Sequence, residues 1–81
     1  MLIIDSFGKN VIIGDRIVGY IDDNVIYINR KKFADLTDDG RIIYESKEIG
    51  YVDDDGEIII RGKEVGYIDA DNNFVFYAGS L

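Results

Sequence analysis

The sequence predicts an all-β fold: a repeat-built antiparallel meander of about ten short strands, closed into a barrel-like ring. Three observations predict it. The apolar segments are short and rich in Ile, Val, Tyr and Phe, which is strand composition. Asp-Gly and Asn-rich turns separate these segments, and such residues supply the positive φ angles of tight hairpins. One pentapeptide motif also recurs at nearly constant spacing, so neighbouring copies can bury one another's apolar faces.

The pentapeptide motif forms one strand of each repeat unit. Its copies, MLIID, VGYID, FADLT, IGYVD and VGYID, lie at residues 1–5, 18–22, 33–37, 49–53 and 65–69. The last four copies are spaced by fifteen, sixteen and sixteen residues, which assigns residues 1–81 to one repeat-built domain.

An apolar triplet follows each motif and forms the second strand of the unit. From the first residue of a triplet to the Gly or Ala of the next motif is always eight residues. The one helix candidate, residues 30–36, is short and fits the repeat better as strand. The triplets are residues 11–13, 26–28, 42–44, 58–60 and 74–76.

Turns of two kinds alternate between the strands. The acidic turns are residues 22–24, 38–40, 54–56 and 71–73, and the basic turns are 14–16, 29–32, 46–47 and 62–63. In a closed meander the two kinds lie at opposite ends. Such a body can stack head to tail or dock an acidic partner, or the charges can simply keep a β protein soluble. The apolar end segments, 2–4 and 74–77, favour closure or pairing with another chain.

Composition limits the chemistry that the chain can perform. The 81 residues include no Cys and no His, which removes thiolate chemistry and the commonest general base. The net charge of −7 disfavours nucleic acid and anionic membranes as partners. No apolar stretch approaches the length of a signal peptide or a membrane span. We therefore expect a cytoplasmic protein that is not an enzyme and needs no cofactor.

Two of the units resemble a known family. The segment GKEVGYID after IIIR recurs as SKEIGYVD after IIYE. Both look like the petals of the bacterial four-fold beta-flower proteins, and the resemblance covers nearly the whole chain. GYVDDDGEIII is more loosely similar to the core of bacterial WG repeats, but Trp and Pro are missing and the period is about half as long. The beta-flower resemblance implies a fold and not an activity, so it assigns no functional residue.

The acidic run at residues 53–57 invites comparison with a calcium loop. The EF-hand pattern requires Gly at the sixth position and Glu at the twelfth. Counting from Asp53, the sixth residue is Ile58, and a count from Asp69 fails as well. Two interpretations remain, namely solvated hairpin turns or an oxygen-ligand site of another kind. If the ring closes, Asp23, Asp39, Asp55 and Asp71 are the candidate ligands.

The motif also carries repeated tyrosines, Tyr20, Tyr51 and Tyr67. Strand alternation places them on the same face as the Val or Ile that opens each motif, opposite the Gly. The rings either pack between units with wet hydroxyls or form an exposed patch for a protein, a second copy or a sugar ring.

A small residue recurs within the motif as Gly19, Ala34, Gly50 and Gly66. Gly inside a strand usually marks a bulge or a close backbone approach, and the alternative is a ligand channel lined by backbone.

The sequence therefore predicts a small non-enzymatic module for protein binding or self-assembly. The alternative function is binding of a divalent cation (Ca²⁺ or Mg²⁺) or a small ligand at the rim of acidic hairpin turns.

Overall fold

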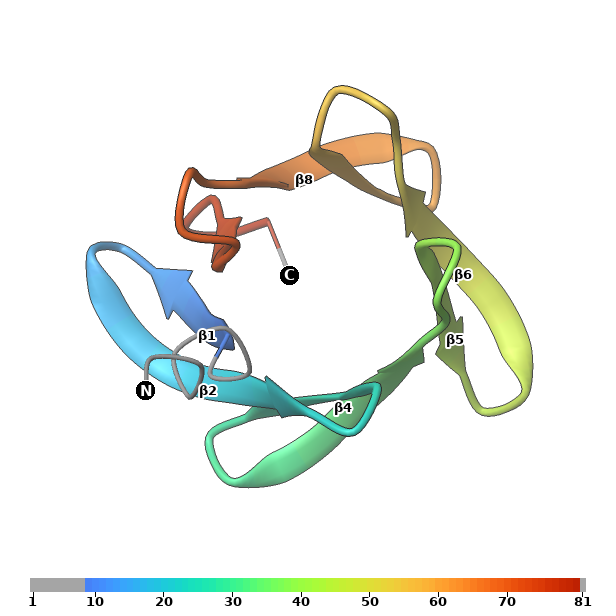
Figure 1. Ribbon diagram of the computed structural model, residues 1–81, viewed down its shortest axis with the longest axis horizontal. Helices are drawn as coiled ribbons and strands as arrows, with labels where there is room; N and C mark the ends of the chain where they lie inside the picture. Colours follow the sequence, from blue (N-terminus) through green and yellow to red (C-terminus); the bar gives the residue numbers. More distant parts are fainter. Residues whose placement is uncertain (1–8, 81) are drawn as a thin grey trace.

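The computed structural model describes residues 9–80, which form nine β-strands closed into a barrel (Figure 1). This architecture confirms the predicted all-β closed meander. The tenth predicted strand, the motif copy at residues 1–5, lies outside the described residues. The described part of the chain has no helix long and apolar enough to cross a membrane. The strands are β1 (Lys9–Ile13), β2 (Arg16–Asp22), β3 (Val25–Ile28), β4 (Lys31–Leu36), β5 (Arg41–Tyr44), β6 (Lys47–Val52), β7 (Glu57–Ile60), β8 (Lys63–Ile68) and β9 (Phe74–Phe76).

Eight of the strands form four hairpins, β1–β2, β3–β4, β5–β6 and β7–β8, which we call petals. Each petal ends in a two-residue tip whose residues both have positive φ, between 50° and 81°. Two consecutive positive φ angles define the type I′ turn, whose twist matches that of the flanking strands. The tips are Gly14-Asp15, Asn29-Arg30, Glu45-Ser46 and Arg61-Gly62.

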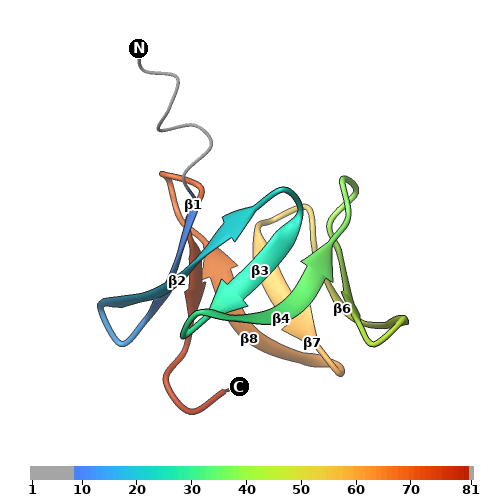
Figure 2. The same ribbon diagram turned by 90° about the horizontal axis from the view of Figure 1, so that it is seen from below.

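The acidic turns connect one petal to the next. Figure 2 shows them at the end of the barrel opposite the petal tips. We call these two sides the acidic end and the basic end. The turn after β2 has two residues, Asp23 and Asn24, both with positive φ. The three longer turns place a single residue with positive φ, Gly40, Gly56 or Asn72, before the next strand.

Every petal contains a β-bulge at the same place. The register shifts after Val11, Ile26, Ile42 and Ile58, each of which lies opposite the Gly or Ala of the motif. A bulge bends its strand and leaves one extra residue unpaired. In β8 this extra residue is Val65, which is 4% exposed, whereas Tyr67 is 41% exposed.

The bulge corrects one expectation from strand alternation. The tyrosines were expected to share a face with the Val or Ile that opens each motif. Instead Tyr51 and Tyr67 face outward, while Ile49 and Val65 pack with the core. The physical reason is that the extra residue interrupts the alternation, so that two consecutive residues, Val65 and Gly66, both lie on the inner side of β8.

The core fills the inside of the barrel in layers. The central layer holds the first residue of each triplet, and most of these side chains are completely buried. The members of this central layer are Val11, Ile26, Ile42, Ile58 and Phe74. Apolar side chains from the motif strands cover the layer toward each end of the barrel.

The barrel closes through a parallel pair, which the antiparallel prediction did not include. β9 pairs antiparallel with β8 and parallel with β1, with Phe74 opposite Val11. The reason is that β9 is the first strand of a further repeat unit. It runs from the acidic end to the basic end, as β1 does, and so the two lie in the same direction. The N–H of Asn10 also donates to Oδ1 of Asn73, at 3.0 Å.

Neighbouring petals meet at junctions that we call seams. In three seams, β2–β3, β6–β7 and β8–β9, the glycine of the motif lies directly against the backbone of the next strand. A Cβ atom there would come within 1.8 to 2.1 Å of a carbonyl oxygen, so no larger residue fits without separating the strands. The glycines are Gly19, Gly50 and Gly66, and the facing carbonyls belong to Tyr27, Ile59 and Val75.

Candidate functional site

The β4–β5 seam differs from the three glycine seams. Ala34 takes the place of the glycine, and its methyl group needs space that the glycine seams do not leave. β4 and β5 share two residue pairs, whereas the glycine seams share three or four. The pairing of β4 with β5 therefore ends earlier on the side of the basic end.

A backbone hydrogen bond is also missing there. In each glycine seam, the residue after the triplet donates its N–H to the carbonyl before the glycine, at 2.8 Å. One example is the bond from Arg61 N to Ile49 O. Among residues 9–80, the equivalent bond from Glu45 N to Phe33 O is not formed. We attribute this loss to the methyl group of Ala34.

The side chains around this seam also depart from the repeat. Phe33 replaces the Val or Ile of the other bulges, and Tyr44 replaces the Ile or Phe that ends the other triplets. Tyr44 is 40% exposed, and its ring packs against Phe33 with centroids 6.4 Å apart. Asp35 replaces the motif tyrosine and pairs with Lys32 at 3.1 Å. The departures concentrate in one seam, which makes it a candidate for a function beyond folding.

An open hollow lies at the basic end beside this seam. Its volume is about 550 Å³. Val65 and Ile60 are almost fully buried, so the hollow reaches the edge of the core. The lining residues are Phe33, Tyr44, Ile49, Ile60 and Val65, with Lys32, Arg61, Lys63 and Ser80.

The three cations of this hollow differ in their pairing. Lys32 lies beside Asp35, whereas Arg61 and Lys63 form no ion pair with any described residue. In a chain with a net charge of −7, two cations without an ion-pair partner among the described residues thus lie next to an apolar surface.

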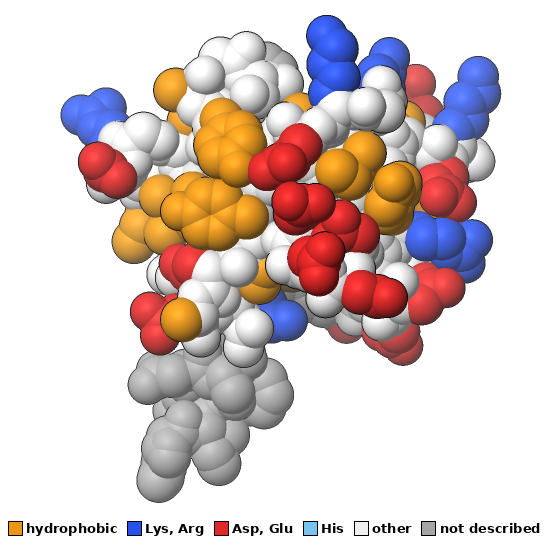
Figure 3. All heavy atoms as spheres, turned by 90° about the horizontal axis from the view of Figure 1, so that it is seen from above, with side chains coloured by type: hydrophobic (Ala, Val, Ile, Leu, Met, Phe, Trp, Pro, Cys, Tyr) orange, Lys and Arg blue, Asp and Glu red, His pale blue; other side chains and the backbone are white. Residues whose placement is uncertain are grey.

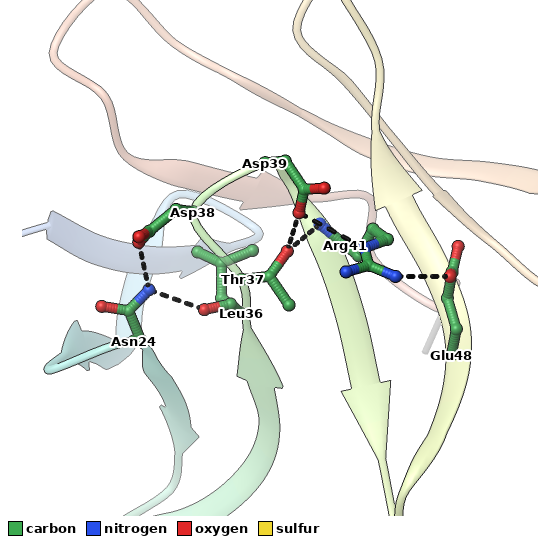
Figure 4. A network of polar contacts seen from close by, with 7 residues as sticks. All are labelled: Asn24, Leu36, Thr37, Asp38, Asp39, Arg41 and Glu48. Carbon is green, nitrogen blue, oxygen red and sulfur yellow. Dashed lines mark hydrogen bonds and ion pairs between the residues drawn. The ribbon is translucent and has the colours of Figure 1, made fainter.

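At the acidic end, some of the carboxylates belong to polar contacts that extend over two neighbouring acidic turns to the β5–β6 petal (Figure 4). Nδ2 of Asn24 donates to Leu36 O at 2.8 Å and to Oδ1 of Asp38 at 3.0 Å. Asp39 accepts hydrogen bonds from Thr37 and Arg41, and these two donors lower the pKa of Asp39. The charge of Asp39 is thus compensated within its own turn.

The longer acidic turns use a carboxylate as a structural acceptor. Oδ1 of Asp69 accepts the N–H groups of Asp71 and Asn73, both at 2.9 Å. The bond from Asn73 contributes most to lowering the pKa of Asp69. Asp53 occupies the same position and accepts the N–H groups of Asp55 and Glu57, at 3.0 and 2.9 Å. These aspartates hold the turns in shape.

One group of carboxylates comes together without a cation. One oxygen from each of Asp53, Asp55 and Glu57 lies within 4.8 Å of the others. A hydrogen bond with Asp53 and the negative charge of Glu64 raise the pKa of Glu57, whereas the backbone N–H of Glu57 lowers the pKa of Asp53. In the preceding petal Arg41 occupies the position of Glu57 and lies 3.7 Å from Glu48.

The four predicted metal ligands do not meet as one group among the described residues. Asp55 belongs to the carboxylate group above, and Asp39 belongs to the network with Arg41. Asp23 borders a hollow of about 430 Å³ at the acidic end, and Asp71 donates its N–H to Asp69. The candidate ligands predicted from the sequence did not include Asp53 or Glu57, although both belong to the acidic run at residues 53–57 and Glu57 takes the place of Arg41 in the repeat.

The predicted tyrosines all lie on the outer surface. Tyr20, Tyr51 and Tyr67 are 45%, 44% and 41% exposed. Tyr20 stacks on Tyr27 across its seam, with ring centroids 4.8 Å apart. Tyr67 packs beside Tyr77, with centroids 6.0 Å apart.

Two of these tyrosines share one face of the barrel. Figure 3 shows hydrophobic side chains on both sides of a band of carboxylates. We call this surface the β6–β9 face. Strand pairing joins its members, since Tyr51 is opposite Ile59, Ile59 opposite Glu64, and Tyr67 opposite both Glu57 and Val75. Its residues are Tyr51, Ile59, Tyr67, Val75 and Tyr77, with Asp53, Asp55, Glu57 and Glu64.

Fold and surface together define the class of the protein: a closed β-barrel built from hairpin repeats, with an outer aromatic face and a hollow at one end. In comparisons with known proteins, the chain matches no family model, no curated protein and no solved structure.

Proposed function

We propose that the protein is a small non-enzymatic module that binds another protein or a second copy of itself. The observation that carries the proposal is the β6–β9 face, which presents exposed aromatic side chains on a four-strand surface. Tyrosines are enriched at protein interfaces because a large apolar ring and a hydroxyl group are both available for contact. The beta-flower resemblance and the cytoplasmic location expected from the sequence belong to the same proposal.

The charge of this face indicates the chemistry of the partner. Glu57 and Glu64 lie on neighbouring strands, close enough for the charge of Glu64 to contribute to the raised pKa of Glu57. The hydroxyl of Tyr77 donates to Oε2 of Glu64 at 2.7 Å, which fixes the carboxylate beside the aromatic rings. A partner that places Lys or Arg here gains ion pairs and cation–π contacts together.

Sedimentation analysis over a wide concentration range tests the proposal. We expect concentration-dependent association that weakens as salt is added, because the contacts are partly ionic. The double variant Tyr51→Ser and Tyr67→Ser should abolish association. Ile17→Ser is the matched control, because Ile17 is 67% exposed but lies outside this face.

If the protein associates equally well after both tyrosines are replaced, the β6–β9 face is not the interface. If it stays monomeric and the tyrosine variants do not change the binding of a hydrophobic dye, the aromatic surface has no binding role and the proposal fails.

A second candidate function is binding of a divalent cation at Asp53, Asp55 and Glu57. The convergence of three carboxylates favours it, since Ca²⁺ and Mg²⁺ take oxygen ligands. The pKa of Glu57 is raised by its hydrogen bond with Asp53 and by the negative charges of Glu64 and Asp53, and a cation there would offset these charges. One oxygen of Asp53 already accepts two backbone N–H groups, which orients the carboxylate in advance.

Thermal unfolding with excess EDTA and then with millimolar Ca²⁺ or Mg²⁺ tests this second function. A site filled at a hundred times its Kd adds about 2.7 kcal/mol. In a domain of this size the midpoint should rise by roughly 10–20 °C. Asp55→Asn should remove the rise and Asp23→Asn should keep it. An unchanged midpoint in wild-type protein would rule out a cation site of useful affinity.

A further inference from the structure

We propose that the basic-end hollow binds a small amphipathic anion, with an apolar body against the core edge and a terminal carboxylate held by Arg61 and Lys63. This inference concerns a different part of the molecule from the β6–β9 face and does not depend on the protein-binding function. Its volume of about 550 Å³ lies in the range typical of small-molecule sites.

The apolar lining determines the body of the ligand. Val65 and Ile60 are 4% and 9% exposed and border the hollow, so a molecule that enters touches the edge of the core. Phe33 and Tyr44 add aromatic surface on the side of the β4–β5 seam. A body without apolar groups would leave this surface facing water and would gain little from entering.

The cations determine the other end of the ligand. Arg61 and Lys63 both border the hollow and have no ion-pair partner among the described residues. A guanidinium group binds a carboxylate through two parallel hydrogen bonds, and a lysine adds a mobile positive charge. Binding therefore needs no rearrangement of existing ion pairs at these two side chains.

The same surface argues against an acidic turn of a second copy as the occupant. The acidic end supplies many carboxylates, but its apolar side chains, such as Ile21 and Ile68, face the inside of the barrel. An acidic turn would reach the cations and leave the apolar lining uncovered. Only a molecule that carries both features matches the hollow.

The hollow follows from the departure at Ala34. The methyl group separates β4 from β5 toward the basic end, and Tyr44 then lies at the surface instead of sealing the core. In the other seams an Ile or Phe fills this position. The same change that weakens the seam thus creates apolar surface that is open to a ligand.

Titration of the full chain with octanoate tests the inference. Binding is measured by calorimetry and by shifts of the methyl NMR signals of Ile49, Ile60 and Val65. We expect octanoate to bind with a Kd of about 1 mM or lower. Octanol has the same apolar body without the charge and should bind roughly tenfold more weakly. Acetate has the charge without the body and should cause no shift of these methyl signals.

Variants at the two cations separate this site from nonspecific attraction. Arg61→Gln and Lys63→Gln should each weaken octanoate by roughly fivefold to tenfold and leave octanol unchanged. Lys47→Gln is the matched control, because Lys47 opens β6 as Lys63 opens β8 but does not border the hollow. All three side chains are exposed, so the unfolding midpoints should stay close to that of wild type.

Three results would overturn the inference. The methyl signals could stay unshifted up to about 10 mM octanoate, which corresponds to a very weak complex. Octanol could bind as tightly as octanoate, which would leave the cations without a role. Lys47→Gln could weaken binding as much as Lys63→Gln, which would indicate a diffuse charge effect.

Discussion

The β4–β5 seam and the three glycine seams are built from the same repeat, yet only the glycine seams are fully paired. In the β6–β7 seam, Gly50 allows the carbonyl of Ile59 to approach closely. A Cβ atom at position 50 would lie only 2.0 Å from this carbonyl oxygen. In the β4–β5 seam, Ala34 prevents this approach, and one residue pair and one hydrogen bond are lost. A single methyl group thus separates a closed junction from an open one.

The difference shows how a repeat protein obtains a site. Equivalent petals give equivalent junctions, so a closed ring of identical units has no distinctive place on its surface. At the β4–β5 seam, Phe33, Ala34, Asp35 and Tyr44 all depart from the repeat. The neighbouring petals keep the barrel closed, and they therefore tolerate one junction that is less complete.

The largest effect should come from making a glycine seam resemble the alanine seam. Gly50→Ala places a Cβ atom 2.0 Å from Ile59 O and 2.9 Å from Ile60 Cα, and both are backbone atoms that cannot rotate away. We expect β6 and β7 to separate and the Arg61–Ile49 hydrogen bond to be lost. Overpacking and the lost bond together should cost about 2–4 kcal/mol. Urea unfolding measures the loss, and a change below about 0.5 kcal/mol would show that the close approach is not needed.

The reverse change should close the open seam. Ala34→Gly removes the methyl group and allows Glu45 N to donate to Phe33 O. The new bond contributes about 1 kcal/mol, but glycine in a strand costs about 0.5–1 kcal/mol, so the free energy of unfolding should hardly change. Hydrogen exchange of the Glu45 amide should slow, whereas the Arg61 amide is the internal control. Exchange as fast as in wild type would mean that the methyl group does not hold the seam open.

A smaller effect should follow from loosening a turn that supports an intact seam. Asp69 lies between β8 and β9 and accepts two backbone N–H groups. Asp69→Ala leaves both donors without this acceptor and should lower the urea midpoint, less than Gly50→Ala does. Asp69→Asn keeps an acceptor oxygen and should lose less. Equal losses for both variants would assign the effect to charge instead of to the turn.

Because the pKa of Asp69 is lowered by folding, its contribution to stability is present above the ordinary value of 3.8 and is lost as pH falls through the folded pKa. The Asn variant should therefore show less acid sensitivity than wild type between neutral pH and that region. An identical acid transition in both proteins would contradict this assignment.

The smallest effect concerns the carboxylates beside the β7–β8 petal. The raised pKa of Glu57 means that its favourable contribution exists at acid pH and is lost as pH rises above the ordinary value of 4.5. Glu57→Gln should therefore stabilise the protein at neutral pH, and the difference should shrink on acidification. In the preceding petal Glu48 lies near Arg41, so Glu48→Gln should give no such gain. Thermal unfolding at several pH values measures both.

Much of the fold could be predicted because the repeat encodes it locally. The constant offset of eight residues places Ile58 opposite Gly66 and Ile42 opposite Gly50, as the structure shows. Positive φ values at Asp23 and Gly40 follow from turn chemistry. These features depend on residues that are close in the chain, so the sequence alone indicates them.

The remainder depends on contacts between distant strands. The inward position of Val65 requires a bulge, and the bulge cannot be inferred from alternation, which predicts the opposite face. The parallel pairing of β9 with β1 depends on where the ring closes. The hollow beside Tyr44 depends on the width of a seam that one methyl group sets. Only the hollow traces back to a departure from the repeat, at Ala34, and the sequence does not contain its geometrical result.

The half unit contributed by β9 has a consequence for anything joined to the barrel. A chain that crosses a barrel an even number of times returns to the side where it entered. Here the described strands cross nine times. Lys9 lies near Asp23 and Asp38 at the acidic end, and Ser80 lies near Arg61 at the basic end, so the two ends of the described chain lie on opposite sides of the barrel. Two segments attached at these points are held on opposite sides of the module. The barrel is then a short spacer with a defined polarity.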